Sequence, residues 1–175
     1  DYMLYPYIAG NILAAVLPEQ AAVWSYPVAS DCKSGEDVSD DRIVINMINS
    51  FLGRMHLASH LDYLNEHQMD LIREGVTYYN TLSEMKKTAV PYFPIGFTNF
   101  GDGIVCAGLK DDNKIYLAVW NLKGEQEITV PIAANITNAK IAYPSKTSVL
   151  LNICKNGIQL TCPETPCAVF LEITI

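Results

Sequence analysis

The spacing of hydrophobic residues along the chain changes near residue 90. Before this point, apolar side chains recur every three or four residues, which places them on one face of a helix. After it, they come in short β-branched and aromatic runs separated by turn residues. The change predicts a helix-containing part over residues 1–91 and a strand-rich domain over residues 92–175, joined through the Pro- and Gly-rich segment 90–103.

Two helices are predicted in the first part from their capping residues, after a short helical piece over 2–8. Ser39 is suited to cap a helix over 40–52, and Asn65 with Gln68 resembles a capping box for a helix over 66–87. The apolar stripe of the first of these helices consists of Val44, Met47, Ile48, Phe51 and Leu52.

Two apolar runs alternate with these helices. Segment 11–19 (NILAAVLPE) lacks polar alternation, which is typical of a strand buried on both faces of a parallel sheet, and segment 54–61 (RMHLASHL) predicts a second strand. The order helix, strand, helix, strand, helix predicts βα units. Two units cannot close a barrel, so we expect this chain to be a fragment of a longer protein.

The second part predicts an antiparallel β-sandwich. Asn156-Gly157 is a strong hairpin signal between two of its strands. The predicted strands cover residues 104–110, 114–122, 125–132, 139–143, 147–154, 157–162 and 167–175. The predicted fold is therefore α/β plus all-β: the last βα units of a (β/α)8 TIM barrel followed by a small antiparallel β-sandwich.

Composition and charge narrow the classes of partner. Of the 175 residues, 50% are hydrophobic and 18% are charged, which favours a packed core. The net charge of −7 argues against nucleic acid or an anionic membrane as a partner, because both are bound through clustered Lys and Arg. No apolar run approaches the roughly 18 residues of a membrane-spanning helix.

Cysteine and histidine spacing argues against a metal or another cofactor. Five cysteines without a CxxC pair predict reduced thiols in a cytoplasmic protein, although a Cys154–Cys162 or a Cys162–Cys167 disulfide stays open. His56 and His60 have the spacing of a metal pair, but on a strand their Cα atoms would lie about 13 Å apart.

Polar side chains at the predicted strand ends are candidate substrate-binding residues. In an α/β barrel, functional groups lie at the carboxyl ends of the strands. Glu19 and Gln20 end the first predicted strand, Trp24 follows them, and Ser59 and His60 end the second strand. A carboxylate and an amide can bind hydroxyl groups, and an indole ring can stack on a sugar. In the alternative interpretation, Glu19 caps a neighbouring helix and Trp24 packs in an outer shell.

Segments 12–27 and 40–79 resemble the end of the barrel in glycoside hydrolase family 36, the α-galactosidase (melibiase) group. The resemblance rests on the runs Leu-Pro-Glu-Gln-Ala and Gly-Arg-Met-His-Leu-Ala-Ser-His-Leu. It implies that segments 11–19 and 54–60 are the seventh and eighth barrel strands. It also fits a terminal sandwich with segment 115–122 as a central strand.

The resemblance implies a retaining hydrolase of terminal α-galactosides, which uses two aspartates about 5–5.5 Å apart. Both aspartates should lie upstream of this chain, so no catalytic residue is assigned here, and Asp1 should lie near the site without being catalytic. The Ser-Asp pairs at Asp31 and Asp40 follow the Pro-Glu-Gln segment and do not receive the role. The implied partner is an α-galactoside oligosaccharide, the fragment alone should be inactive, and the full-length protein is expected to be a homo-oligomer.

Two other functions stay open. The sandwich could be a carbohydrate-binding module or a purely structural one. Trp120, its only tryptophan, alternates into the apolar face of its strand, which favours the structural role. The parent protein could also be a related α-glycan hydrolase or transferase with another sugar preference.

Overall fold

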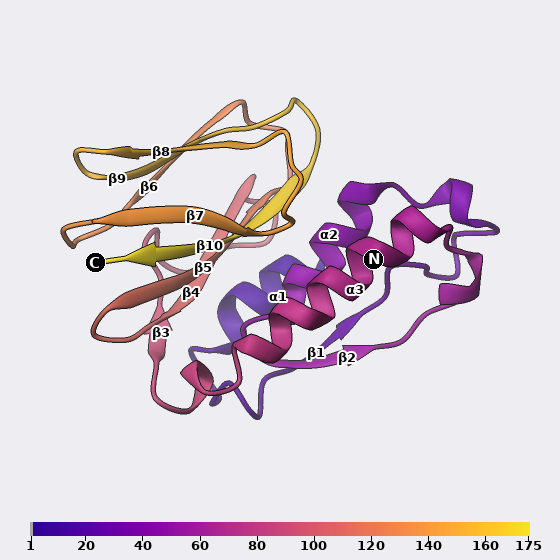
Figure 1. Cartoon of the computed structure of the whole chain (residues 1–175), viewed down its shortest axis with the longest axis horizontal. Coiled ribbons are helices and arrows are strands. Elements are labelled where there is room, and N and C mark those ends of the chain that lie inside the picture. The colour runs from indigo at the N-terminus through magenta and orange to yellow at the C-terminus, as the bar shows by residue number, and fades with distance from the viewer. Residues whose placement is uncertain (1) are drawn as a thin grey trace.

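The computed structural model describes residues 2–175, and Asp1 lies outside the described residues. The helices and the strands of the first part lie at one end of the molecule and the antiparallel strands at the other (Figure 1). The helices are α1 (Tyr5–Ile12), α2 (Asp40–Asn49) and α3 (Glu66–Thr81). The strands are β1 (Ala22–Ser25), β2 (Arg54–Leu57), β3 (Val90–Tyr92), β4 (Ile104–Lys110), β5 (Lys114–Asn121), β6 (Glu127–Pro131), β7 (Asn138–Tyr143), β8 (Leu150–Cys154), β9 (Gly157–Thr161) and β10 (Cys167–Thr174).

The caps predicted for α2 and α3 are confirmed. The Ser39 hydroxyl accepts a hydrogen bond from the Arg42 amide at 3.2 Å. The Asn65 side chain accepts from the Gln68 amide, and the Gln68 side chain accepts from the Asn65 amide, both at 3.0 Å. These bonds satisfy amide donors that a helix start leaves without a partner. Helix α3 ends at Thr81, and a 3-10 turn covers Met85–Lys87 near the predicted helix end.

The strand predicted over 11–19 is wrong. Helix α1 continues to Ile12, turns follow it, and the first strand begins only at Ala22. A short apolar run without alternation is compatible with a buried helix as well as with a buried strand, and length alone separates the two poorly. The predicted helical piece over 2–8 was therefore placed too early in the sequence.

The prediction of the last βα units of a TIM barrel is also wrong. The described residues form three α-helices and two antiparallel sheets, and the only parallel pairing among them joins β1 to β2, four residues each. The chain is a small β-rich structure. Alternating helical and apolar segments predict βα units only if each apolar run is a strand of the sheet, and the 11–19 run is not one.

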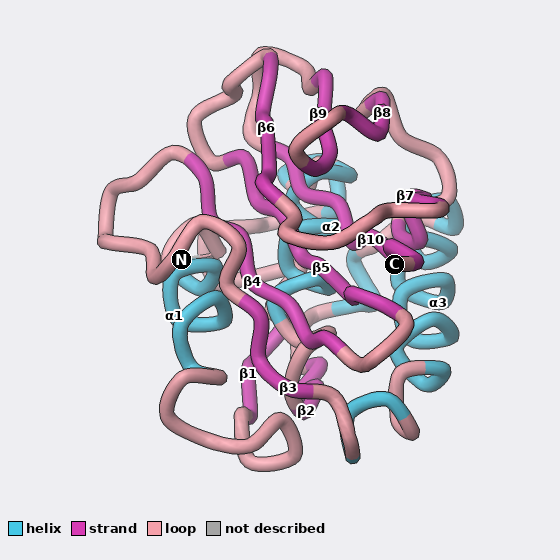
Figure 2. The backbone as a smooth tube through the Cα atoms, turned by 90° about the vertical axis from the view of Figure 1, so that its left-hand side faces the viewer, coloured by secondary structure: helices cyan, strands magenta, loops and turns pink. Residues whose placement is uncertain are grey.

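The seven strands predicted for the second part are present, with β3 in addition. They form a five-stranded sheet of order β3-β4-β5-β10-β7 and a three-stranded sheet of order β6-β9-β8. The helices lie on one side of the five-stranded sheet (Figure 2). Alternate residues of β5 belong to two different cores, with Leu117 and Val119 facing the three-stranded sheet and Ala118 and Trp120 facing the helices.

Phe51, just after α2, joins the helices to the five-stranded sheet. Its ring is fully buried, and its centroid lies 5.1 Å from that of Tyr143, 5.3 Å from Phe170 and 5.7 Å from Tyr78. These three rings come from β7, β10 and α3. The predicted domains 1–91 and 92–175 therefore share a hydrophobic core, and their independence stays a prediction.

Removing the Phe51 ring should strongly destabilise the fold. We expect Phe51→Ala to lower the free energy of unfolding by about 3–5 kcal/mol, because a buried ring is lost and a cavity remains. Phe51→Leu, which keeps much of the volume, should lose about 1 kcal/mol. Urea denaturation measures both, with Phe100→Ala, whose ring is 79% exposed, as a near-neutral control. A loss below about 1 kcal/mol for Phe51→Ala would contradict the central role of this ring.

Candidate functional site

The carboxyl ends of the parallel strands β1 and β2 border an open hollow. The hollow has a volume of about 540 Å³. Ser59 joins the two chain segments there: its hydroxyl accepts from the Val28 amide and donates to the Val28 carbonyl, both at 2.7 Å. None of the described residues that line the hollow carries a carboxylate. They are Tyr26, Val28, Ala29, Ser30, Ala58, Ser59 and His60.

An aromatic face, defined here as Tyr5, Trp24, Tyr26 and His56, extends from this hollow along the strands. The Trp24 ring stacks on Tyr26 at 5.5 Å and 17° and contacts the His56 ring at 4.9 Å. Tyr26 also contacts the Tyr5 ring at 6.5 Å. Trp24 is 44% exposed although its strand neighbours Val23 and Ser25 are buried. The alternation of β1 therefore turns Trp24 outward.

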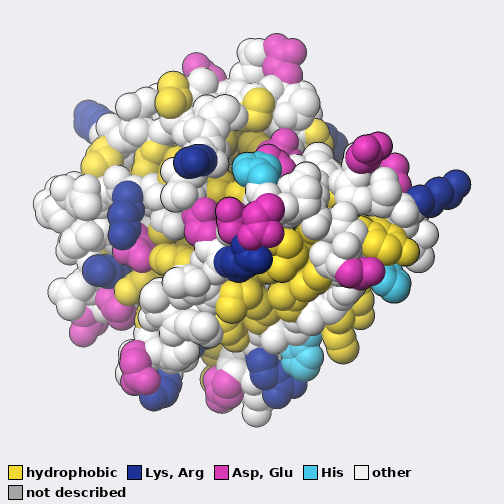
Figure 3. All heavy atoms as spheres, turned by 45° about the vertical axis from the view of Figure 1, so that its right-hand side comes forward, with side chains coloured by type: hydrophobic (Ala, Val, Ile, Leu, Met, Phe, Trp, Pro, Cys, Tyr) yellow, Lys and Arg dark blue, Asp and Glu magenta, His cyan; other side chains and the backbone are white. Residues whose placement is uncertain are grey.

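The molecular surface agrees with this arrangement. On the side that brings the helical end of the molecule forward, hydrophobic side chains form a broad area with histidines along its edge (Figure 3). Broad exposed apolar areas are uncommon on a monomer and often mark a binding surface.

Among the described residues, no helix is both long and apolar enough to cross a membrane.

Helix α2 positions the loop that follows β1. The buried Asn46 amide accepts from the Tyr26 N–H at 3.0 Å and donates to the Arg42 carbonyl at 2.9 Å. The Arg42 guanidinium donates to the Pro27 carbonyl at 3.0 Å and to both carboxylate oxygens of Asp31 at 2.8 Å. These contacts fix the backbone beside the aromatic face.

The Arg42–Asp31 pair is bidentate, and it shifts the pKa of both side chains. The hydrogen bonds from Arg42 lower the pKa of Asp31 from 3.8 to about 2, and the same bonds raise the pKa of Arg42. Arg42 also lies 4.7 Å from the centroid of the Tyr2 ring. The sequence did not indicate this pair, because its two residues are eleven positions apart and belong to different elements.

His60 lies at the edge of the hollow, where the sequence predicted a binding residue. Its ring stacks on Tyr63 at 5.2 Å and 17°, and its Nδ1 lies 3.8 Å from an Asp62 carboxylate oxygen. The side chain is 70% exposed, so the ring is accessible to a ligand. The structure thus brings Trp24 and His60 to neighbouring parts of one surface.

Glu19 and Gln20 lie elsewhere. They precede β1 and so lie at the amino end of the parallel pair, opposite to His60. Glu19 lines a hollow of about 500 Å³ with Gly53, Arg54, Tyr79, Ser83, Lys86 and Lys87. Gln20 lines another, smaller one. The structure does not bring Glu19 and Gln20 together with Trp24 and His60, and their role in sugar binding stays a prediction.

Lys86 is the unusual group in the Glu19 hollow. Burial lowers its pKa to about 7. Its ammonium lies 3.8 Å from the centroid of the Tyr79 ring and donates to the Gly53 carbonyl at 2.8 Å. Tyr79 donates to the same carbonyl at 3.2 Å. The amine therefore has structural partners that hold the start of β2 against the end of α3.

The other candidate groups have ordinary partners or are not described. Asp40 pairs with His67 at 2.8 Å, on the outside of α2. Asp1 falls outside the described residues. Within residues 2–175, no group of three or more His, Cys, Asp or Glu side chains is arranged to hold a metal ion.

The Asp31–Arg42 pair should stabilise the fold in a pH-dependent way. Because the folded-state pKa of Asp31 is lowered, its contribution should be full above about pH 4 and be lost as the pH falls toward 2. The melting temperature of Asp31→Asn should therefore lie below that of the wild type at pH 7 and converge with it near pH 2. Asp62→Asn, which changes another exposed carboxylate, is the control. If the difference in melting temperature between the wild type and Asp31→Asn stays constant from pH 7 to pH 2, the Asp31–Arg42 pair does not stabilise the fold in this way.

The comparisons with known proteins bear on the fold. No protein-family model matches the chain, and no curated protein matches it in sequence. Among solved structures, the galactosidase domain of alpha-galactosidase-sucrose kinase, AgaSK, is similar with a TM-score of 0.65 and 12% sequence identity. The match covers 100% of this chain and 25% of that chain, so this chain spans about a quarter of its length. At this identity the likeness shows the fold alone, a fold distantly similar to that of a family 36 galactosidase domain.

Proposed function

We propose that this chain is the C-terminal portion of a retaining glycoside hydrolase that acts on terminal α-galactosides, and that its aromatic face contributes to sugar binding. The observation that carries the proposal is the position of Trp24. Its half-exposed ring is stacked on Tyr26 beside the hollow at the carboxyl ends of β1 and β2. The likeness in fold to a galactosidase domain supports the class of enzyme.

The aromatic face has the chemistry that a neutral sugar requires. A pyranose ring presents C–H groups on a face and hydroxyl groups around its edge, so an indole can cover the face while polar groups bind the edge. Trp24 contacts the rings of both Tyr26 and His56, which reduces the conformational entropy lost when a ligand orders it. His60, exposed at the edge of the hollow, can exchange hydrogen bonds with hydroxyl groups.

The chemical step is assigned to groups outside this chain. Retaining hydrolysis needs a nucleophilic carboxylate and an acid/base carboxyl close to the scissile bond. The described residues lining the hollow supply neither. We therefore propose that both aspartates belong to preceding sequence and that residues 1–175 alone bind sugar without hydrolysing it.

The sandwich is proposed to be structural. Its only tryptophan, Trp120, is fully buried between the five-stranded sheet and the helices. A carbohydrate-binding module requires an exposed aromatic platform, which Trp120 does not provide. Burial on both faces of β5 instead favours a role in supporting the helices that position the aromatic face.

Replacing Trp24 should weaken sugar binding more than it weakens the fold. For the full 175-residue chain titrated with an α-1,6-linked galactosyl disaccharide, we expect Trp24→Ala to raise Kd roughly 5- to 30-fold, or about 1–2 kcal/mol. Ligand-observed nuclear magnetic resonance measures the weak affinity. Phe100→Ala, which removes another exposed ring, is the matched control and should bind like the wild type. Equal affinities for the wild type and Trp24→Ala would remove the aromatic face from the sugar site.

The same titration tests the predicted role of Glu19 and Gln20. If either side chain contacts the sugar, its alanine variant loses a hydrogen bond, worth about 1.5–3 kcal/mol where a charge is involved. In a full-length enzyme this corresponds to roughly a 10- to 100-fold fall in kcat/KM for Glu19→Ala. Wild-type affinity in both variants would confine the sugar site to the aromatic face.

Tighter binding of an α-glucoside than of the α-galactoside would overturn the proposed sugar preference, but it would not contradict the proposed position of the sugar site.

A further inference from the structure

The connection between β9 and β10 carries two cysteines. Cys162 directly follows the last residue of β9, and Cys167 is the first residue of β10, with four residues between them. Strand β9 is the central strand of the three-stranded sheet, whereas β10 belongs to the five-stranded sheet. A bond between these two cysteines would therefore join the two sheets of the sandwich.

The two thiols interact with each other and with the side chain of Asn121. Cys167 is buried in the hydrophobic cluster between the two sheets, and Cys162 packs against the same cluster. Each thiol also interacts with the other and with the Asn121 side chain. Asn121 is 1% exposed and is itself fixed, because its amide accepts from the Glu125 N–H at 2.9 Å and donates to the Glu125 carbonyl at 2.8 Å. Both thiols thus lie against a rigid group.

The backbone on each side of the pair is also held in place. The Cys162 amide donates to the Gln126 carbonyl at 2.8 Å, and Cys167 is paired in register with Asn121. Both residues therefore lie at anchored strand ends, and they share the hydrophobic cluster between the two sheets. A disulfide needs two side chains that can approach each other, with Cα atoms within about 7 Å.

The pair is asymmetric in exposure and in charge. Cys162 is half-buried, whereas Cys167 is 4% exposed. The interaction with Cys167 lowers the pKa of Cys162, and the same interaction together with burial raises the pKa of Cys167. Cys162 is accordingly the thiol that ionises first and that a reagent in solution can reach.

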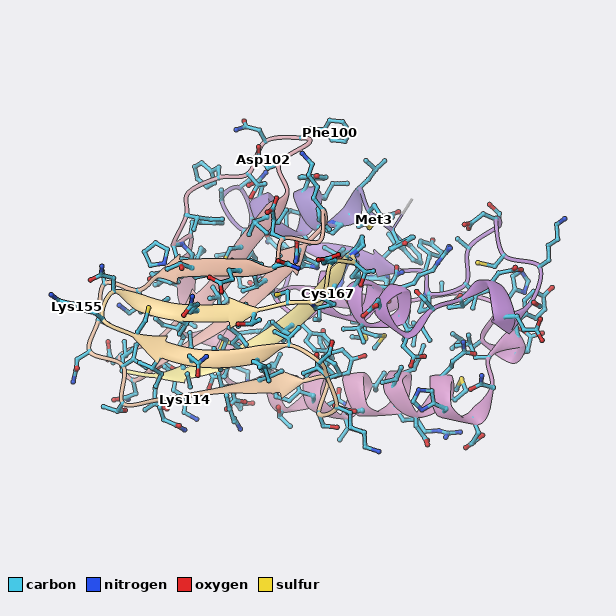
Figure 4. All side chains as sticks on the ribbon, turned by 90° about the horizontal axis from the view of Figure 1, so that it is seen from above. Met3, Phe100, Asp102, Lys114, Lys155 and Cys167 are labelled. Carbon is cyan, nitrogen blue, oxygen red and sulfur yellow. The ribbon has the colours of Figure 1, made fainter. Side chains whose placement is uncertain are left out.

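The remaining cysteines lack this arrangement. Cys32 and Cys106 are buried, and burial raises the pKa of the Cys106 thiol. Cys154 is paired in register with Gly157, at the turn end of β9, five residues from Cys162. At about 3.3 Å per residue this is roughly 16 Å, too far for a disulfide. Figure 4 agrees, with Lys155 at the outer tip of the sandwich and Cys167 near the helices. A Cys154–Cys162 disulfide is therefore excluded.

We propose that Cys162 and Cys167 are a redox-active pair that is closed to an intramolecular disulfide by small-molecule disulfides such as oxidised glutathione. The Cys162 thiolate attacks one sulfur of the reagent, which forms a mixed disulfide and releases one thiolate. The Cys167 thiol then loses its proton and attacks the Cys162 sulfur, which forms the Cys162–Cys167 bond and releases the second thiolate. Two protein hydrogens are lost, and one disulfide reagent is reduced to two thiols.

The test uses the reduced 175-residue chain, incubated with oxidised glutathione at neutral pH, alkylated with iodoacetamide and digested with trypsin. Cleavage after Lys155 leaves residues 156–175 as one peptide that contains both Cys162 and Cys167, whereas Cys154 lies in the separate peptide 147–155. We expect peptide 156–175 to lose two hydrogens and to resist alkylation. Peptide 147–155 should stay fully alkylated.

Three variants assign the roles of the two thiols. Cys167→Ser should accumulate a stable glutathione adduct on Cys162, because the resolving thiol is absent. Cys162→Ser should take up no glutathione in peptide 156–175, because Cys167 is buried. Cys154→Ser is the matched control, since it also removes a half-buried thiol, and it should close the disulfide at the wild-type rate.

A thermal measurement provides a second readout. The closed disulfide should raise the melting temperature of the wild-type chain by about 5 °C, and the rise should be absent in Cys162→Ser. The proposal is overturned if peptide 156–175 keeps two alkylated thiols or carries two glutathiones. It is equally overturned if Cys154 reacts as fast as Cys162.

Discussion

The buried contact between Phe51 and the rings of Tyr143 and Phe170 is the constraint on which the rest of the structure depends. It fixes the end of α2 against β7 and β10, two strands that are far from α2 in the sequence. Helix α2 in turn holds the segment after β1 through Asn46 and Arg42. The position of Tyr26, and with it the stack under Trp24, is therefore set by packing on the five-stranded sheet. The sandwich influences the candidate site through this chain of contacts and without supplying a residue to it.

Features that depend on local chemistry could be predicted from the sequence. The caps at Ser39 and Asn65 involve residues three positions apart, and the seven strands of the second part are bounded by turn residues such as Asn156-Gly157. The barrel prediction failed because one of its two apolar runs, 11–19, is not a strand, and the helix or strand state of that run is decided by tertiary packing. Ala9 and Leu13 are buried in the core shared with the sheet. Sequence periodicity contains no information about that partner.

The candidate site shows how far a small boundary error can propagate. Trp24 and His60 were predicted as binding residues, and both lie on the surface formed by β1, β2 and the segments that follow them. Glu19 and Gln20 were predicted to end the first strand, but that strand begins after them, at Ala22. In a parallel pair the two ends of a strand face opposite sides, so a shift of a few residues moved these side chains from one end to the other. Ser59, which was predicted together with His60 at the end of the second strand, lines the same hollow as His60.

The two ends of the parallel pair differ in charge, and this difference bears on the kind of ligand each could bind. The amino end carries Glu19 together with Arg54, Lys86 and Lys87 around one hollow. A ligand there would have to displace water from these charged side chains and to compete with the contacts that already hold Lys86. The carboxyl end offers aromatic rings, a serine with its bonds satisfied and an exposed imidazole, with no carboxylate or ammonium among the described lining residues. A neutral, hydroxyl-rich ring loses little by leaving water for such a surface, because its C–H face gains contacts and its hydroxyls stay at the rim. The carboxyl end therefore suits an uncharged sugar better than the amino end does.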